Sequence, residues 1–278
     1  MKPYIQALLA IALWGVLAFL ALELSRMPPF LLVGVALIMG SFCSIYKISQ
    51  WRVSFPTLLL GIYGIFGFHF CLFLALRHAP PIEANLINYL WPLLIVVLAP
   101  LFLPGYRLHI HHIIAALLGF IGAVLIVTGG KLNFRSDYII GYSLAGTSAF
   151  IWASYSLLTK RVPPFPNAAI GLFCLSAGVL SLIMHWALES AYTFTMRDFL
   201  ILLLLGLGPM GSAFFLWDAA LKNGDPRIIG SLAYLTPMLS TLILVATGNG
   251  KFTWLFGFSM VLIVGGAVIG SLSFRRNA

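Results

Sequence analysis

Residues 61–94 read GIYGIFGFHFCLFLALRHAPPIEANLINYLWPLL, and residues 206–239 read GLGPMGSAFFLWDAALKNGDPRIIGSLAYLTPML. The two stretches align without a gap at a shift of 145 residues. The identities include Gly61, Phe70, Ala75, Leu76, Pro81, Tyr89, Leu90 and Pro92, which recur as Gly206, Phe215, Ala220, Leu221, Pro226, Tyr234, Leu235 and Pro237. Both copies are apolar enough to cross a bilayer. Repeated membrane segments are typical of secondary transporters, which form their site between the halves.

The composition excludes an ordinary soluble domain. The chain has 278 residues, of which 61% are hydrophobic and 8% are charged. Soluble domains average about 45–50% apolar and about 25% charged residues. The net charge of +9 therefore indicates basic cytoplasmic loops rather than nucleic-acid binding.

Ten apolar runs are long enough to span a membrane, because a spanning helix needs about 20 residues. We predict an all-α membrane protein with helices at roughly 4–22, 29–47, 55–76, 82–103, 110–129, 138–158, 168–188, 198–221, 227–247 and 253–273. Charged residues, prolines and glycines separate the runs. No connection is long enough for a soluble domain, so any function must reside among the helices.

The distribution of basic residues orients these helices. Ten helices place both termini on one side, together with Lys2, Lys47, Arg52, Arg107, Lys160, Arg161, Lys222, Arg227, Arg275 and Arg276. The other side has six basic residues, so the positive-inside rule predicts cytoplasmic termini. The shift of 145 maps helix 3 onto helix 8, which predicts two five-helix repeats, 1–131 and 132–278. Because five is odd, the second repeat must be inverted.

Several short motifs resemble a known family. The paired segments YLWP (89–92) and YLTP (234–237), in ten short helices with tight loops, resemble the drug/metabolite transporter superfamily of the EamA type. NLINYLWPLL (85–94), His69 and Trp152 in SAFIWASYSLLTK resemble its YddG-like group of aromatic amino acid exporters. The resemblance covers essentially the whole chain. It implies a basket-like bundle in which helices 1, 3, 4, 6, 8 and 9 surround a central cavity and helices 5 and 10 are peripheral.

Helices 4 and 9 carry the first candidate site residues. Asn85, Tyr89 and Pro92 share one face at i, i+4 and i+7, and amides are costly against lipid, so we expect this face to border a cavity. Tyr234 is the counterpart of Tyr89. Pro92 and Pro237 act either as paired hinges or as static kinks, because proline removes a helical hydrogen bond.

Helices 1, 3 and 6 carry the others. Ser148 and Trp152 belong to a polar stripe on helix 6, and Trp14 lies deep in helix 1. Deep indoles either stack on an aromatic substrate or pack against lipid and core. His69 lies within helix 3, where an ionisable group marks a substrate path or bonds to a neighbouring helix.

Other polar residues favour structural roles. Asp218 lies four residues before Lys222, so we interpret it as an i,i+4 pair at the interface. The histidines of HIHH (109–112) do not form a specific ligand pattern, so no metal site is predicted. The three cysteines show no pairing pattern, and we predict neither a disulfide nor a cofactor.

These observations favour an exporter of aromatic amino acids or related amphipathic metabolites, working by alternating access in a bacterial inner membrane. The alternative within the same class is another cargo, such as a drug, a nucleotide sugar or a small metabolite. An intramembrane enzyme would need motifs such as HExxH or GxSxG, which do not occur. A scaffold would not need an inverted repeat. We expect a monomer, with a dimer as the alternative.

Overall fold

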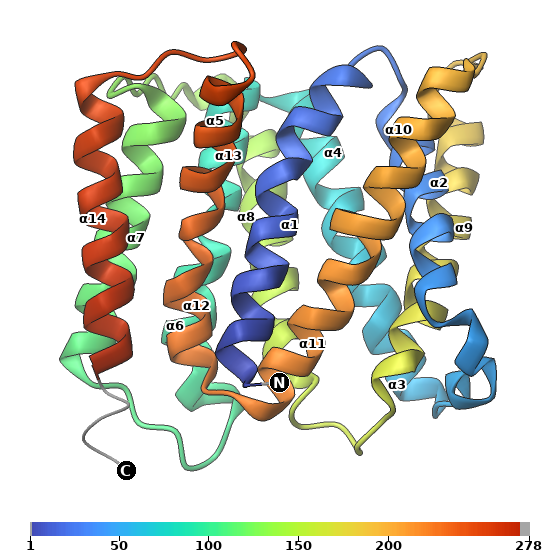
Figure 1. The fold of residues 1–278 in the computed structure, drawn as a ribbon, viewed down its shortest axis with the longest axis horizontal. Coiled ribbons are helices and arrows are strands. Elements are labelled where there is room, and N and C mark those ends of the chain that lie inside the picture. Colours follow the sequence, from blue (N-terminus) through green and yellow to red (C-terminus); the bar gives the residue numbers. More distant parts are fainter. Residues whose placement is uncertain (1, 273–278) are drawn as a thin grey trace.

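Figure 1 shows a computed structural model of the chain, which describes residues 2–272. Residue 273, the last of the predicted tenth span, lies outside the described residues. The same holds for Arg275 and Arg276, two of the basic residues in the orientation argument. The start of α1 and the end of α14 lie at the same face of the bundle, the lower one in Figure 1.

The described residues form ten helical passes, as the sequence predicts. The first five passes are α1 (Pro3–Glu23), α2 (Pro29–Ser41) with η1 (Phe42–Trp51), α3 (Phe55–Ile62) with η2 (Tyr63–Gly67) and α4 (Phe68–His78), α5 (Pro81–Asn88) with α6 (Trp91–Phe102), and α7 (Ile110–Thr128). The second five are η3 (Ser136–Tyr138) with α8 (Ile139–Leu158), η4 (Asn167–Ala169) with α9 (Ile170–Leu188), α10 (Met196–Leu207) with η5 (Gly208–Ser212) and α11 (Ala213–Asn223), α12 (Pro226–Ala233) with α13 (Leu235–Ala246), and α14 (Trp254–Leu272).

Two pairs of passes are interrupted at equivalent places in the repeats. The third and eighth passes each contain a π-helical turn, Tyr63–Gly67 and Gly208–Ser212, which coincide under the shift of 145 residues. The fourth and ninth passes are broken at Tyr89–Leu90 and at Tyr234. The similarity of the repeats therefore extends to their irregular backbone.

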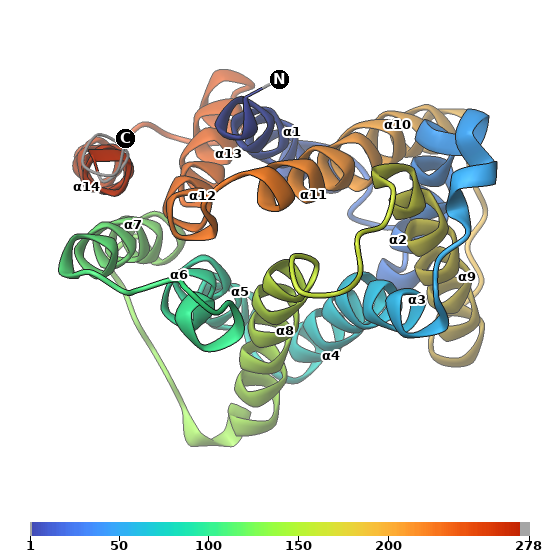
Figure 2. The ribbon, with the colours of Figure 1, turned by 90° about the horizontal axis from the view of Figure 1, so that it is seen from below.

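The packing of the passes follows the same internal symmetry. In the view from below, α7 packs beside α14 at one end and α2 beside α9 at the other (Figure 2). Between these ends, α1 packs against α11 and α13 in one layer, and α8 packs against α4 and α6 in the other. The first and sixth passes are repeat mates, and each packs against the equivalent two passes of the other repeat: the eighth and ninth for α1, and the third and fourth for α8.

Small residues allow the close contact between α7 and α14. A Cβ added to Gly266 would lie 2.6 Å from the carbonyl oxygen of Ala115, and one added to Gly270 would lie 3.3 Å from the Ala115 Cβ. Gly266 and Gly270 are four residues apart, and such a spacing of small residues commonly lets membrane helices pack closely, here the last passes of the two repeats.

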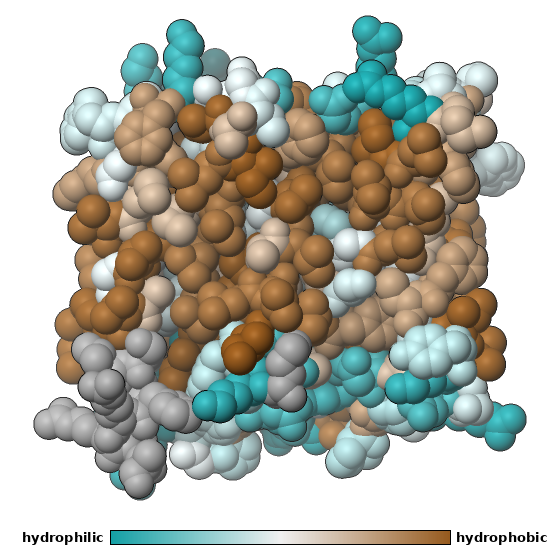
Figure 3. Space-filling view, viewed as in Figure 1, coloured by the Kyte–Doolittle hydropathy of each residue, from teal (hydrophilic) through white to brown (hydrophobic). Residues whose placement is uncertain are grey.

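The outer surface is that of a membrane protein. On the face seen in Figure 3, a broad apolar belt covers the middle of the bundle, with polar side chains along its upper and lower edges. Within residues 2–272, eight segments are long and apolar enough to cross a bilayer, and Trp254–Gly270 is a shorter apolar helix. The remaining pass, α8, is less apolar because serine, threonine and tyrosine recur along it, and these side chains are mostly buried inside the bundle.

Gly266 tests the importance of the α7–α14 contact. Gly266→Val should lower the free energy of unfolding by about 1–3 kcal/mol, because its side chain would meet backbone atoms of α7. Gly265→Val is the matched control, since a Cβ there has no other atom within 4 Å. Thermal unfolding in detergent measures both variants. Equal melting temperatures would contradict the packing argument.

Candidate functional site

A cavity of about 450 Å³ lies in the middle of the bundle. Its walls come from α1, α2, α4, α5, α6, α8, α10, η5, α11 and α13, so both repeats contribute. It extends to the α1–α2 connection, where Ser25 and Pro29 line it and are exposed. That connection lies at the face opposite to the start of α1 (Figure 1). The volume is within the range of about 300–1,000 Å³ typical of small-molecule sites.

Aromatic rings from several passes form the inner end of the cavity, which we call the aromatic floor: Trp14, Trp91, Trp152 and Phe214, backed by Trp217. The Trp14 ring lies 5.9 Å from that of Trp152 and 6.1 Å from that of Phe214, and the Trp217 centroid is 5.1 Å from Trp14. These tilted and edge-on arrangements are favourable for aromatic pairs. An aromatic ligand would meet ring faces and edges here.

Side chains of α5 and of Tyr89, the residue that follows it, form a polar wall beside the floor. Asn85, Asn88 and Tyr89 all line the cavity. Ser148 does not line it. Its hydroxyl, fully buried on α8, donates to the Asn88 Oδ1 at 2.9 Å. With that oxygen engaged, the Asn88 amide NH₂ remains available as a donor.

His69 lines the cavity from α4 with a defined orientation. Its Nδ1 bonds the carbonyl oxygen of Ile65 at 2.7 Å, and since a carbonyl only accepts, Nδ1 carries the hydrogen. In the neutral ring Nε2 is then an acceptor. The imidazole therefore offers the cavity an acceptor while its donor is used within α4.

Thr236 and Ser240 supply hydroxyls from α13. The Thr236 Oγ1 is buried and has no hydrogen-bond partner among the described residues. A buried hydroxyl without a partner costs roughly 1–3 kcal/mol. Thr236 therefore stands at the cavity wall with the hydrogen-bonding capacity of its hydroxyl unused among the described residues.

Tyr234 does not line the cavity, although its repeat mate Tyr89 does. It is fully buried outside the cavity lining, and Gly119 of α7 packs against its ring. Its hydroxyl accepts from the Leu93 N–H at 3.1 Å and donates to the Tyr89 carbonyl at 3.3 Å. In an unbroken helix Leu93 would bond Tyr89 directly. Tyr234 thus bridges the break in the fourth pass and does not face the cavity.

The two candidate hinge prolines lie directly after the breaks. Pro92 is in the first turn of α6 and Pro237 in the first turn of α13. Proline is tolerated in the first turn, where its missing N–H removes no intrahelical bond. Because a new helix begins just after each break, Pro92 and Pro237 fit there without the loss of a helical hydrogen bond.

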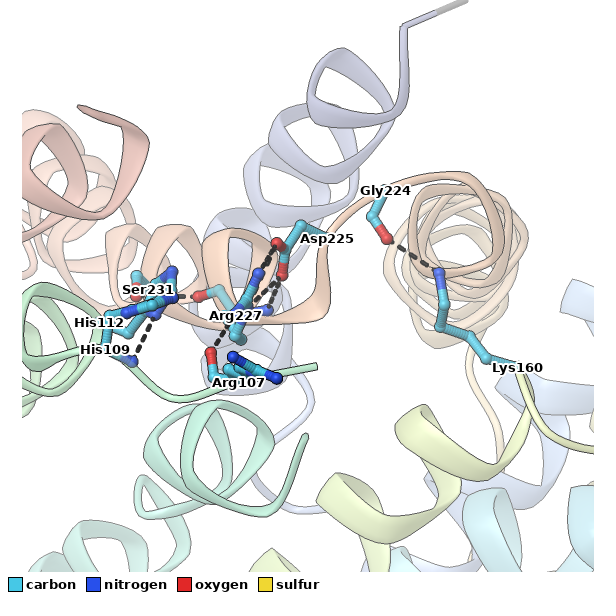
Figure 4. A network of polar contacts seen from close by, with 8 residues as sticks. All are labelled: Arg107, His109, His112, Lys160, Gly224, Asp225, Arg227 and Ser231. Carbon is cyan, nitrogen blue, oxygen red and sulfur yellow. Dashed lines mark hydrogen bonds and ion pairs between the residues drawn. The ribbon is translucent and has the colours of Figure 1, made fainter. Parts of the chain in front are cut away.

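Polar contacts close the lower face, below the aromatic floor. Lys160, just after α8, donates to the carbonyl oxygen of Gly224 at 2.9 Å (Figure 4). It also donates to the carbonyl oxygen of Leu221 at 2.7 Å, and so caps the end of α11. Burial lowers the pKa of the Lys160 ammonium. We call this contact the Lys160 cap.

A second contact links the loops beside the Lys160 cap. Arg227 bonds Asp225 at 2.6 Å and donates to the carbonyl oxygen of Arg107 (Figure 4). Burial alone would raise the pKa of Asp225, but hydrogen bonds from Arg227 outweigh it and hold that pKa below its usual value. The lower face is thus tied together across the two repeats.

Several floor and wall residues do not stand out in the sequence when each helix is considered by itself. Under the shift of 145, His69 maps onto Phe214 and Trp91 onto Thr236, and all four line the cavity. The repeat could therefore have located Phe214 and Thr236. Trp217 maps onto Leu72, which also lines the cavity, but Trp217 itself lies behind the floor, where its Nε1 donates to the Ser156 Oγ of α8 at 3.1 Å.

Comparison with known proteins decides the family. Residues 1–128 and 139–272 both match the EamA-like transporter family. The chain belongs to this family. Relatives within and near it include the aromatic amino acid exporter YddG of Ancylobacter novellus, 38% identical with 96% of each chain covered. YddG of Escherichia coli K12 is 26% identical, with 99% of each chain covered. A probable amino-acid metabolite efflux pump of Salmonella typhimurium is 27% identical over 99% of this chain and 96% of its own.

A crystal structure also superposes on this EamA chain with a TM-score of 0.95, at 37% identity and with 99% of each chain covered. The family and the apolar passes establish a multi-pass membrane protein of the drug/metabolite exporter type, acting in transport and not in catalysis. A small molecule is therefore its substrate.

The bridging hydroxyl of Tyr234 can be tested within this EamA chain. Tyr234→Phe should destabilise the protein by about 1–3 kcal/mol, since it leaves the Leu93 N–H and the Tyr89 carbonyl unpaired in a buried setting. Tyr89→Phe makes the same chemical change at the repeat mate. Thermal unfolding and amide exchange at Leu93 should respond only to Tyr234→Phe. Faster exchange in both variants, or in neither, would contradict the bridge.

Proposed function

We propose that the protein exports aromatic amino acids and related amphipathic metabolites from the cytoplasm of a bacterium. The observation that carries this proposal is the pairing, in one cavity of about 450 Å³, of the aromatic floor with a wall of amide, imidazole and hydroxyl groups. The 38% identity to an exporter of that name supports the same substrate class.

Each part of the substrate would meet a matching part of the cavity. The apolar ring stacks against Trp14, Trp152 and Phe214. The ammonium meets the acceptor Nε2 of His69 and the side-chain oxygen of Asn85, and the carboxylate meets the NH₂ of Asn88. Of the described residues that line the cavity, none is Asp, Glu, Lys or Arg. Recognition by neutral dipoles predicts modest affinity and broad selectivity, which suits release of the cargo.

Transport would proceed by alternating access between the repeats 1–131 and 132–278. With both termini in the cytoplasm, the cavity extends toward the outside of the inner membrane, and the Lys160 cap closes the cytoplasmic side. Inverted repeats can adopt each other's conformations, which opens the site to the opposite side. Pro92 and Pro237 would serve as the hinges of the exchange. All lining residues come from one chain, so a monomer would be sufficient.

Flux in liposomes tests the function directly. The purified protein should carry labelled phenylalanine and tryptophan in a saturable manner, and alanine much more slowly, because alanine lacks a ring for the floor. An imposed pH gradient should leave the flux unchanged, since the cavity lining contains no carboxylate and Asp218, below the floor, is paired with Lys222. Absence of saturable aromatic flux would refute the assignment.

Trp152 tests the aromatic floor. Trp152→Leu should raise the KM for phenylalanine by up to about tenfold, since an aromatic contact contributes about 0.5–1.5 kcal/mol. Trp254→Leu is the matched control, because Trp254 is 81% exposed at the start of α14. The same liposome assay compares the two variants. An unchanged KM in Trp152→Leu would remove the floor from the recognition scheme.

Another cargo of the drug/metabolite class is the second candidate, supported by the similarity to an amino-acid metabolite efflux pump. Competition discriminates between the two candidates. Excess tryptophan should block phenylalanine flux in the first case and leave the flux of an unrelated metabolite unaffected in the second.

A further inference from the structure

A second space lies beneath the aromatic floor, on the side of the Lys160 cap. Its lining residues are Trp152, Tyr155, Thr159, Phe214, Trp217, Asp218 and Leu221. It is too narrow to admit a water molecule in this conformation. Trp152 and Phe214 line both this space and the cavity above, so these two rings separate the two compartments.

Asp218 is the carboxylate of this lower space. Its Oδ2 accepts from Lys222 Nζ at 2.6 Å and from Asn167 Nδ2 at 2.8 Å. The expected pair with Lys222 is therefore present, but the side chain of Asp218 is only 3% exposed. It lies beneath the floor and not at an exposed interface.

The other oxygen of Asp218 has no partner. Oδ1 is buried and makes no hydrogen bond in the described structure. A buried acceptor left unpaired is costly, and more so when it carries charge. Lys222 does not turn to it, because Nζ also donates to the carbonyl oxygen of Phe165 at 3.2 Å and lies 3.4 Å from the centroid of that ring.

We propose that Asp218 is a loading site for the ammonium group of the substrate, used when the protein is open to the cytoplasm. The inference rests on the proposed function and deepens it. Separation of α8 from α11 would break the bond from Trp217 to Ser156 and widen the space lined by Asp218. An amino acid entering there places its ammonium at Oδ1 and its ring against the lower faces of Trp152 and Phe214.

The charges of the site suit a zwitterion better than an anion. Oδ1 supplies an acceptor with negative charge, and a charge-assisted hydrogen bond to an ammonium is stronger than a neutral one. The cation of Lys222 stays on Oδ2 and balances the Asp218 charge before the substrate arrives. The negative charge of the substrate carboxylate is balanced as well, because the Lys222 ammonium lies beside the same site.

The loading site differs from the upper cavity in one respect. Below the floor the ammonium meets a carboxylate, whereas above it the acceptors of His69 and Asn85 are neutral. Binding is therefore tighter at the cytoplasmic face than at the outer face. This asymmetry changes the KM at each face and leaves the equilibrium distribution of the substrate unchanged.

Membrane vesicles of opposite orientation test the proposal. Inside-out vesicles present the cytoplasmic face to labelled phenylalanine, and right-side-out vesicles present the outer face. Asp218→Asn should raise the KM about tenfold in inside-out vesicles, the scale of one lost charge-assisted hydrogen bond, and leave it within twofold in right-side-out vesicles. Asparagine can keep its oxygen toward Lys222 and Asn167, so the structural bonds persist. Asp137→Asn, at an exposed ion pair, is the control.

Two analogues give an independent measurement on the wild-type protein, should Asp218→Asn fail to fold. 2-Phenylethylamine retains the ammonium and 3-phenylpropionate retains the carboxylate. In inside-out vesicles the amine should compete with phenylalanine more strongly than the acid. Stronger competition by the acid, or an equal KM change at both faces in Asp218→Asn, would overturn the loading site alone. Absence of phenylalanine flux in wild-type vesicles would overturn the proposed function and this inference together.

Discussion

The structure depends on satisfying backbone groups wherever a membrane helix is interrupted. Water is not available inside a bilayer, so each freed N–H or carbonyl needs a partner within the protein. At the break in the fourth pass, the Tyr234 hydroxyl accepts from the Leu93 N–H and donates to the Tyr89 carbonyl. In the π-helical turn of the eighth pass, the Pro209 carbonyl accepts a hydrogen bond from the Trp14 Nε1 at 3.1 Å. Both interruptions lie beside the cavity, and Trp14, which repairs one of them, also lines it.

These repairs cross between the repeats. Trp14 belongs to the first repeat and Pro209 to the second, whereas Tyr234 belongs to the second and Leu93 to the first. The bonds therefore hold the two halves together through their irregular segments. A rearrangement that opened the cavity to the other face would have to break these hydrogen bonds or move the bonded segments together. The interrupted segments are therefore the places where such a motion is constrained.

The backbone repeats closely, but the cavity does not. Asn85, Asn88 and His69 of the first repeat correspond to Gly230, Ala233 and Phe214 of the second. The polar wall thus comes mainly from one repeat, while the second supplies Phe214 and Trp217 to the floor. Divergence of the side chains between the repeats gives the cavity a polar side and an aromatic side.

The sequence by itself determined the membrane class, the positions of the ten passes and the internal repeat, because apolar length and a constant shift of 145 residues are properties of the chain alone. It also indicated Trp14, His69, Asn85, Tyr89 and Trp152, which all line the cavity. Deep aromatic and amide residues are conspicuous in an apolar background.

Only the tertiary structure decided how repeat mates differ in role. Tyr89 and Tyr234 occupy equivalent places in the sequence, yet one borders the cavity and the other bridges a backbone break. Likewise, Asp218 and Lys222 form the pair that their spacing predicts, but only the packing of α8 and α11 buries the carboxylate and leaves its Oδ1 without a partner. The reason is that hydrogen-bond satisfaction depends on which distant atoms meet, and a local sequence pattern does not contain that information.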